Sequence, residues 1–255
     1  MPASYAHYRF GKLVLPNLPP DARQCISRFR RMFDVGLQGP DFFFYYNPLM
    51  KTAVGQLGGQ FHSQTGKEFF TRACAAATSE AARAYLYGLL GHYCLDSACH
   101  PFVQSKVDSG EVRHVALESE FDRYLLEMDG EPSPHTYNIS KFLKLTLGEC
   151  MTVAEFFPGA TGANVNRGVR NMIFALNFLS SKNRKGRERL LKLINANLLD
   201  NLVPRRGLPV YARMDSELLA RFNRQVRSYP EMLRQIQEHM QTDEPLGEDF
   251  QATFG

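Results

Sequence analysis

Apolar residues recur three and four positions apart along most of this chain, with polar residues between them. This spacing is typical of amphipathic helices, and the runs are separated by proline, glycine and helix-capping residues. No two alternating runs are joined by a hairpin turn, so we predict no sheet. Helices are expected at 21–32, 112–127, 139–156, 167–179, 186–201 and 215–227, with two more between 66 and 100. The sequence therefore predicts an all-α fold.

Prolines set the expected ends of two helices. The helix that begins near Ser79 should stop before Pro101, because proline lacks the N–H that continues the hydrogen-bond ladder. Pro230 should likewise begin a separate last turn or short helix, and the acidic residues after 242 should fray. We find no linker and no internal repeat, which predicts a single domain over residues 1–255.

Composition narrows the class of protein. The chain is 44% hydrophobic and 22% charged, as in globular proteins that bury a full core. No apolar run approaches the roughly 18 residues that cross a bilayer, and the N-terminus lacks the apolar stretch of a secretory signal. Five cysteines without disulfide-scaffold spacing fit a reducing compartment. We therefore expect a cytoplasmic protein without a transmembrane segment.

Positive charge gathers in the C-terminal third. The chain carries a net charge of +4, but residues 182–234 hold 13 Lys+Arg against 5 Asp+Glu, a local excess of +8. Such an excess favours an anionic partner, either a phospholipid surface or nucleic acid. A solvated helix surface explains the same charge run.

The strongest chemical signal is a pair of motifs spaced for helices. His92, Asp96 and His100 lie at intervals of four, and His114 and Glu118 repeat that interval. Residues four apart share one face of a helix, one above the other. Imidazole and carboxylate groups presented together suit zinc. The two segments therefore predict a metal site.

Three further residues become candidates because of these motifs. His7 lies in YAHYRFG, Asp41 in LQGPDFFFYY and His62 in GGQFHSQTG. A lone histidine is usually a core or surface residue, so none of the three would stand as a ligand alone. The aromatic run 42–46 is set between Gly-Pro-Asp and Asn-Pro, which favours a buried loop or short helical turn over a strand.

These motifs together resemble the zinc-dependent phospholipase C family. The resemblance rests on five motifs, which along the chain are HYRFG, GPDFFFYY, QFHSQTG, GHYCLDSACHP and HVALESEFD. It is specific in the order of the motifs and in their residue types, and the motifs span about residues 2–125. That family shares its all-helical fold with fungal zinc-dependent single-strand nucleases. The resemblance implies a trinuclear zinc cluster, in which a water or hydroxide between metals attacks phosphorus.

The resemblance also implies which residues hold up to three zinc ions. The ligand sets carried over are Asp41, His62, His92 and Asp96 for one zinc, His100, His114 and Glu118 for a second, and His7, Asp96 and the amine and carbonyl of the first residue for a third. Asp96 would bridge two metals. Asp41 could serve as ligand, general base or both.

Two ligand assignments stay open, and one interval departs from the family. If Met1 is removed, the first residue is Pro2, which would then complete the third site. Asp122 lies one turn beyond Glu118, and we favour Glu118 because it lies a single turn from His114. The interval between Asp96 and His100 is shorter than in the secreted phospholipases, so the second zinc could be bound differently.

Substrate contacts are predicted at four residues. Phe42 and Tyr45 could wall a headgroup pocket, since a quaternary ammonium prefers aromatic faces, although burial in the core explains them too. Arg205 and Arg206 could contact phosphate through their guanidinium groups, although a solvent loop is the simpler reading.

Three functions remain open at this point. The first is a zinc phosphodiesterase that cleaves phospholipids to diacylglycerol and a phosphorylated headgroup. The second is a zinc nuclease that acts on single strands, with the basic segment 182–234 along the strand. The third is a non-catalytic, zinc-stabilised helical domain that binds a partner. The order of the motifs favours the first.

Overall fold

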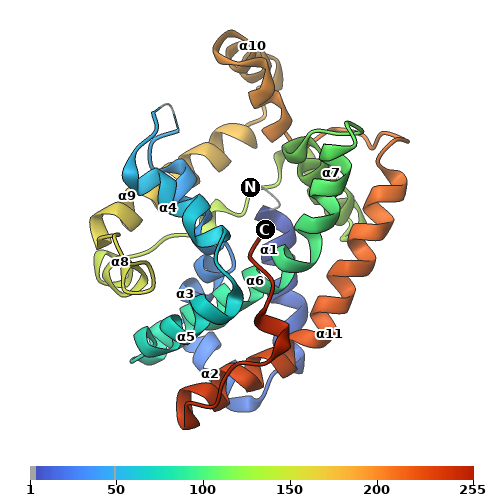
Figure 1. The fold of residues 1–255 in the computed structure, drawn as a ribbon. Helices are drawn as coiled ribbons and strands as arrows, with labels where there is room; N and C mark the ends of the chain where they lie inside the picture. Colours follow the sequence, from blue (N-terminus) through green and yellow to red (C-terminus); the bar gives the residue numbers. More distant parts are fainter. Residues whose placement is uncertain (1–3, 49) are drawn as a thin grey trace.

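The computed structural model describes residues 4–48 and 50–255, and these residues are almost entirely helical (Figure 1). The α-helices are α1 (Ser4–Val14), α2 (Pro20–Arg28), α3 (Arg30–Gly36), α4 (Ala53–His62), α5 (Gly66–Ala76), α6 (Glu80–Asp108), α7 (His114–Met128), α8 (Leu147–Ala154), α9 (Gly162–Leu179), α10 (Arg184–Ile194) and α11 (Ala212–Thr242). The 3₁₀ helices are η1 (Leu15–Asn17), η2 (Gly39–Tyr45), η3 (Pro134–Thr136), η4 (Ser140–Phe142), η5 (Ala196–Asn201) and η6 (Glu248–Phe250). Within the described ranges the only β-pairing is an isolated bridge between Thr65 and Thr253. The predicted all-α fold is confirmed.

Helix α6 forms the centre of the molecule, and most of its residues from Ala82 to Asp96 are buried. Its N-terminus is capped by Ser79, whose hydroxyl oxygen accepts from the Ala82 amide at 3.1 Å. Helix α3 approaches α6 so closely that a Cβ on Gly88 would lie 2.2 Å from the Phe33 carbonyl oxygen. Only glycine fits there, so a Gly88→Ala substitution would force the two helices apart.

The two helix boundaries that we predicted at prolines are wrong. Helix α6 continues through Pro101 to Asp108, and α11 continues through Pro230 to Thr242. A proline inside a helix removes one hydrogen bond. At Pro101 the lost bond belongs to the Ser97 carbonyl, and both residues line an open cleft where water can reach that carbonyl. The packing of the two long helices against each other outweighs the local cost.

One cluster of buried hydrophobic residues extends from Tyr5 to Phe254. The chain after 242, which we expected to fray, belongs to it. Asp243 ends α11 with φ of 58°, and the His239 Nδ1 donates to the Glu244 carbonyl at 2.7 Å, so the chain turns back. The buried side chains of this returning segment are Leu246, Phe250 and Phe254. The burial of these apolar side chains stabilises the segment more than the acidic residues between them favour fraying.

The returning segment is fixed beside α5 and α6. The Tyr93 hydroxyl donates to the carbonyl oxygens of Asp249 and Ala252, each at 3.1 Å, and the Gly66 amide donates to Ala252 at 2.8 Å. The Phe254 ring lies 4.9 Å from the Tyr93 ring centre. The C-terminal segment is thereby placed beside α6 (Figure 1), and the Phe254 carbonyl lies 3.1 Å from the His100 Nδ1.

Candidate metal centre

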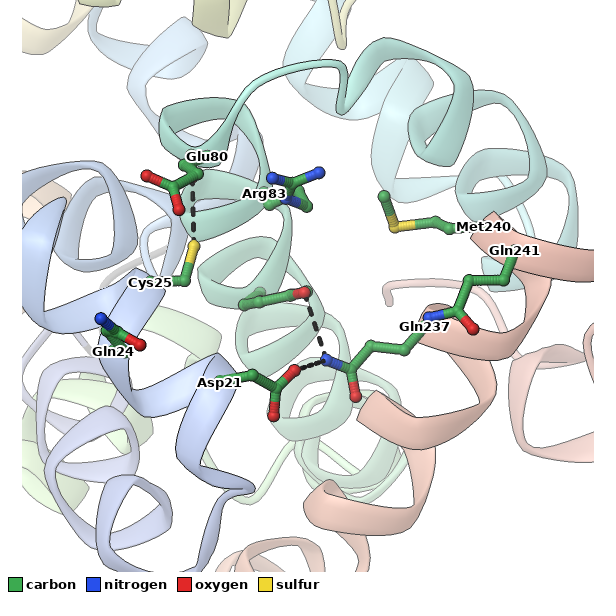
Figure 2. Close-up of a pocket in the computed structure, with 9 residues that line it drawn as sticks. Asp21, Gln24, Cys25, Glu80, Arg83, Gln237, Met240 and Gln241 are labelled. Atoms are coloured by element: carbon green, nitrogen blue, oxygen red, sulfur yellow. Dashed lines mark hydrogen bonds between the residues drawn. The ribbon is translucent and has the colours of Figure 1, made fainter.

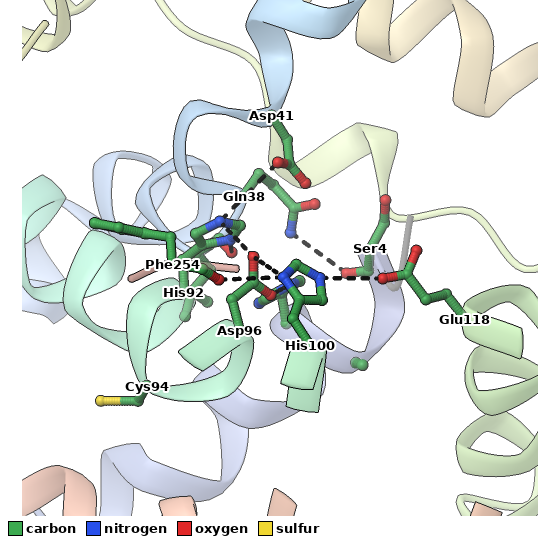
Figure 3. A network of polar contacts seen from close by, with 12 residues as sticks. Ser4, Gln38, Asp41, His92, Cys94, Asp96, His100, Glu118 and Phe254 are labelled. Carbon is green, nitrogen blue, oxygen red and sulfur yellow. Dashed lines mark hydrogen bonds and ion pairs between the residues drawn. The ribbon is translucent and has the colours of Figure 1, made fainter. Parts of the chain in front are cut away.

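Helix α6 presents three of the predicted residues along one face. The Asp96 Oδ2 lies 3.1 Å from the His92 Nε2 and 3.8 Å from the His100 Nδ1. Asp96 is also contacted from outside the helix, by the His7 Nε2 at 3.1 Å and by the His62 Nε2 at 3.6 Å. Figure 3 shows Asp96 between His92 and His100. One buried carboxylate is therefore surrounded by four imidazoles.

The 3₁₀ turn η2 places Asp41 above His92. The Asp41 Oδ1 lies 3.2 Å from the His62 Nε2 and 4.0 Å from the His92 Nε2. Gly39 permits this approach, because its φ is +55° and a Cβ there would lie 2.2 Å from the His92 ring. The Gly-Pro-Asp sequence is thus needed to pass the backbone over the histidine.

Helix α7 supplies the residues on the other side of His100. The Glu118 Oε1 lies 3.2 Å from the His100 Nε2 and 3.0 Å from the His114 Nε2. Asp122 has a different role, because its oxygens accept from the backbone amides of Tyr5 and Ala6 at 3.0 and 2.9 Å. Asp122 thereby fixes the start of α1, which carries His7, and the geometry favours Glu118 as the ligand.

Backbone carbonyls orient three of the imidazole rings. The Nδ1 of His62 donates to Gly58 at 2.7 Å, that of His92 to Leu37 at 3.3 Å, and that of His100 to Phe254 at 3.1 Å. A hydrogen bond at one ring nitrogen fixes the tautomer and directs the other nitrogen toward a metal. In each case the other nitrogen is Nε2, and it faces a carboxylate of the cluster.

The electrostatics of the cluster require a strong positive partner. Burial raises the pKa of Asp96, but the neighbouring histidines hold it well below its usual value. Burial opposes the charge on His62, yet hydrogen bonds with Asp41 and Asp96 raise its pKa to about 10. Buried carboxylates are retained in proteins when they are paired or coordinate a metal. Protonated imidazoles fill that role here, and a metal cation could replace their protons.

Several observations fit zinc at these positions. The His7 Nδ1 and the His92 Nε2 are buried without a hydrogen-bond partner among the described residues, although both rings lie against carboxylates. A cavity of about 20 Å³ lies between His7, Asp96, His100 and Glu118. Three groups have ligand atoms within 4.8 Å of one another: His7, His92 and Asp96; Asp41, His62 and His92; and His100, His114 and Glu118. Nitrogen and carboxylate donors in groups of three are the set that zinc prefers.

The structure thus brings together all the predicted ligands that it describes, and Pro2 lies outside the described residues. Cys94 and Cys99 are buried beside the cluster but belong to none of the three groups. All five cysteines are free.

A cleft of about 520 Å³ opens onto this cluster. Three cluster histidines line it, together with polar side chains, the aromatic ring of Phe44 and the end of the C-terminal segment: His62, His100, His114, Ser63, Ser97, Gln104, Ala252, Thr253 and Gly255. The cluster is therefore open to solvent on one side and buried on the other.

The substrate contacts predicted from sequence are placed differently. Phe42 is fully buried and packs against Phe43 and Phe157, so it forms core rather than a pocket wall. Phe44 takes that place, because side chains three apart in a 3₁₀ helix lie one above the other, which aligns Phe44 with Asp41. Tyr45 is half-buried and faces a separate small cavity that Asp122 also lines.

Arg205 and Arg206 are exposed in a loop, and neither lines the cleft. The neighbouring Gly207 packs against the Arg123–Glu120 ion pair of α7, where a Cβ would lie 2.6 Å from the Arg123 guanidinium. The two arginines therefore belong to an exposed surface loop, and their positions do not support the predicted contact with phosphate.

The family assignment follows from comparison with known proteins. A family model described as zinc dependent phospholipase C matches residues 6–156, which is more than half of the chain and includes every described residue of the cluster. The chain belongs to the zinc-dependent phospholipase C family. No curated protein and no solved structure matches it. For this phospholipase C family member, the described helices include none with the length and apolar character to span a bilayer.

A second cleft, of about 380 Å³, lies at the N-terminal end of α6 (Figure 2). Its polar groups largely satisfy one another, because the Gln237 amide donates to Asp21 at 3.0 Å and the Cys25 thiol donates to the Glu80 carbonyl at 3.2 Å. No histidine lines it, and none of the three metal-binding groups borders it. The candidate metal-binding groups of the described residues thus lie at the His–carboxylate cluster and not at this second cleft.

Proposed function

We propose that this protein is a zinc-dependent phosphodiester hydrolase that cleaves a phospholipid to diacylglycerol and a phosphorylated headgroup. The observation that carries the proposal is a cluster of three adjoining His–carboxylate groups, two of which present histidines to one cleft. The family to which the chain belongs supports a lipid substrate. We propose up to three zinc ions held within these groups, with His92, which belongs to two of them, binding one ion through its Nε2.

The side chains of the cluster have separate tasks in this proposal. Zinc held by the three groups would polarise the phosphodiester and make a water molecule acidic enough to react near neutral pH. Asp41 is kept ionised, because hydrogen bonding with His62 and the nearby His92 lower its pKa despite burial. An ionised carboxylate within the cluster can hold a metal or accept a proton from the attacking water.

The cleft fits a lipid headgroup. Its volume of about 520 Å³ lies within the range of small-molecule sites, roughly 300–1,000 Å³. The Phe44 ring lies 5.5 Å from the His62 ring centre, so an ammonium group stacked on Phe44 would stand next to the cluster. The cleft is thus suited to a headgroup that carries both a phosphate and a cation.

Parallel assays on two phosphodiesters test the proposal. Zinc-loaded protein is incubated with phosphatidylcholine and with single-stranded DNA, and we expect diacylglycerol from the first and no cleavage of the second. Cleavage of DNA alone would replace the proposal with a nuclease. Failure on both substrates with zinc bound would favour a partner-binding domain.

Two variants sharpen these assays. Asp41→Asn should lower kcat by about 100-fold or more, since it removes a charged group at the reacting atoms. Arg205→Ala combined with Arg206→Ala should leave KM unchanged, because both side chains lie outside the cleft.

A further inference from the structure

Helix α10 directs three of its large apolar side chains into solvent. Leu193 is 84% exposed, Ile194 is 55% exposed and Leu190 is 45% exposed. The buried positions of the same helix are Arg187 and Leu191. A surface helix of a globular protein normally packs its apolar face on the core. In α10 the apolar arc is instead left without a partner among the described residues.

A cationic stripe runs beside this apolar arc. Lys185, Arg189 and Lys192 are four and three positions apart, so they line up along the helix, and all three are exposed. None of them forms an ion pair with any residue that the structure describes. The helix thus has three sectors, one packed on the protein, one apolar and one cationic.

Helix α10 projects from the body of the molecule (Figure 1). It packs on η5, and η5 is tied to α7. The Arg113 guanidinium lies 2.6 Å from the Asp200 carboxylate, and the Ser119 hydroxyl donates to the Asp200 carbonyl at 2.6 Å. Arg113 and Ser119 adjoin His114 and Glu118 in the sequence. The position of α10 is therefore fixed relative to the cluster.

We propose that α10 is a docking helix that inserts its apolar arc into the surface of an anionic phospholipid bilayer, an inference that rests on the proposed lipid substrate. Helices of this composition lie in the plane of the interface, with leucine side chains among the acyl chains and Lys and Arg at the phosphates. Docking through α10 would hold the cleft near the headgroups that it hydrolyses.

A second copy of this chain suits the surface less well. A symmetric pair of α10 helices in contact through the same arc would bring the cationic stripes of both copies close together. Like charges at that distance repel, whereas the phosphates of anionic lipids attract all three side chains. Charge complementarity therefore selects the bilayer.

Co-sedimentation of the full-length, zinc-loaded protein with vesicles tests the proposal. The vesicles contain phosphatidylcholine alone or phosphatidylcholine with about 30% phosphatidylserine, a composition that supplies the negative surface potential. We compare the wild type with a triple variant Leu190→Ser, Leu193→Ser, Ile194→Ser and with a second variant Lys185→Gln, Arg189→Gln, Lys192→Gln. The matched control is Leu147→Ser with Met151→Ser, because these α8 side chains are 67% and 65% exposed.

We expect the wild type to bind the anionic vesicles more tightly than the neutral ones, and each α10 variant to bind them roughly tenfold or more weakly. The α8 control should bind like the wild type, and all variants should have unchanged melting temperatures. Equal binding by the α10 variants, an equal loss in the α8 control, or dimers that only the α10 variants dissociate would each overturn the proposal.

A soluble phosphodiester separates this proposal from the proposed function. The α10 variants should hydrolyse p-nitrophenyl phosphorylcholine as fast as the wild type, because α10 contributes no residue to the cleft. Vesicle binding through α10 without hydrolysis of any phosphodiester would contradict the enzyme and leave the docking helix intact. Hydrolysis of a phosphodiester without vesicle binding would support the enzyme and contradict the docking helix.

Discussion

The His100 imidazole donates a hydrogen bond to the backbone carbonyl of Phe254, 154 residues later in the chain. The bond, of 3.1 Å, joins the C-terminal segment to the metal centre. Because a carbonyl can only accept, Nδ1 carries a proton, and Nε2 is the nitrogen that faces Glu118 at 3.2 Å. The returning segment therefore orients a ligand in addition to covering the core.

Shortening the Phe254 side chain should both destabilise the fold and reduce zinc binding. Its ring is fully buried against Phe69, Phe70 and Tyr93, so Phe254→Ala should lower the free energy of unfolding by about 3–5 kcal/mol. The zinc bound per chain should fall too, as the carbonyl that holds His100 is loosened. Denaturant titration and metal analysis measure the two effects. Phe174→Ala, at an exposed position, should change neither, and equal effects of the two variants would contradict this role.

Asp96 should be the most sensitive position for metal binding. Four imidazole nitrogens lie within 3.8 Å of its oxygens, and an Asp96→Asn substitution keeps the shape but removes the charge. We expect at least one zinc to be lost, and turnover to fall by about 100-fold or more. Native mass spectrometry counts the ions. The matched control is Asp34→Asn, a buried carboxylate paired with Arg30 at 2.8 Å, which should keep the full zinc content. Full zinc in both variants would exclude Asp96 as a ligand.

The sequence predicted which His and carboxylate side chains lie together, because their placement depends on local spacing. An interval of four on a helix places His92, Asp96 and His100 along one line wherever the helix lies, and the same holds for His114 and Glu118. That these two lines face each other is a tertiary fact, but the resemblance to the family supplied it. The predictions that helices end at Pro101 and at Pro230 were wrong, because the tertiary packing of α6 and α11 outweighs one lost hydrogen bond.

Features that depend on distant contacts were missed. The sequence marks Leu246, Phe250 and Phe254 as apolar residues four apart, which in retrospect indicates a packed segment, but nothing local says that it returns to His100. The sequence predicted that Phe42 lines the pocket, whereas Phe44 does, and this difference has a simpler cause. The run was expected to be a loop or helical turn, and only the three-residue period of η2 determines which ring shares a face with Asp41.

Zinc binding should release protons. In the metal-free protein the carboxylates raise the pKa of His62 to about 10, and that of His100 to about 9. Both rings are thus protonated near neutral pH, and zinc requires the neutral ring, so affinity should increase as the pH rises toward those values. Isothermal titration calorimetry in two buffers of different ionisation enthalpy measures the released protons. A binding enthalpy that is the same in both buffers would refute this linkage.

Asp215 should reduce stability at high pH. Burial and the nearby Glu120 raise its pKa to about 7, against about 3.9 in an unfolded chain. Between those values the native state holds a proton that the unfolded chain has released, so stability falls as the pH rises through this window. Asp215→Asn should add about 1–2 kcal/mol at pH 8, after allowance for solvent screening, and nothing near pH 4. Urea titrations at both pH values measure this.

The control for Asp215 is Glu155→Gln, an exposed carboxylate on the surface, which should change stability by less than about 0.5 kcal/mol at either pH. A gain for Asp215→Asn that is equal at pH 4 and pH 8 would mean that its charge is not the cause.

The most direct test of the central claim is a zinc titration of metal-free protein in the presence of phosphatidylcholine, with diacylglycerol release as the signal. We predict no release without zinc, an increase with each addition, and a plateau at no more than three equivalents, held within the three groups of ligands. Release that is unchanged by zinc, or no release once the ligands are saturated, would contradict the account.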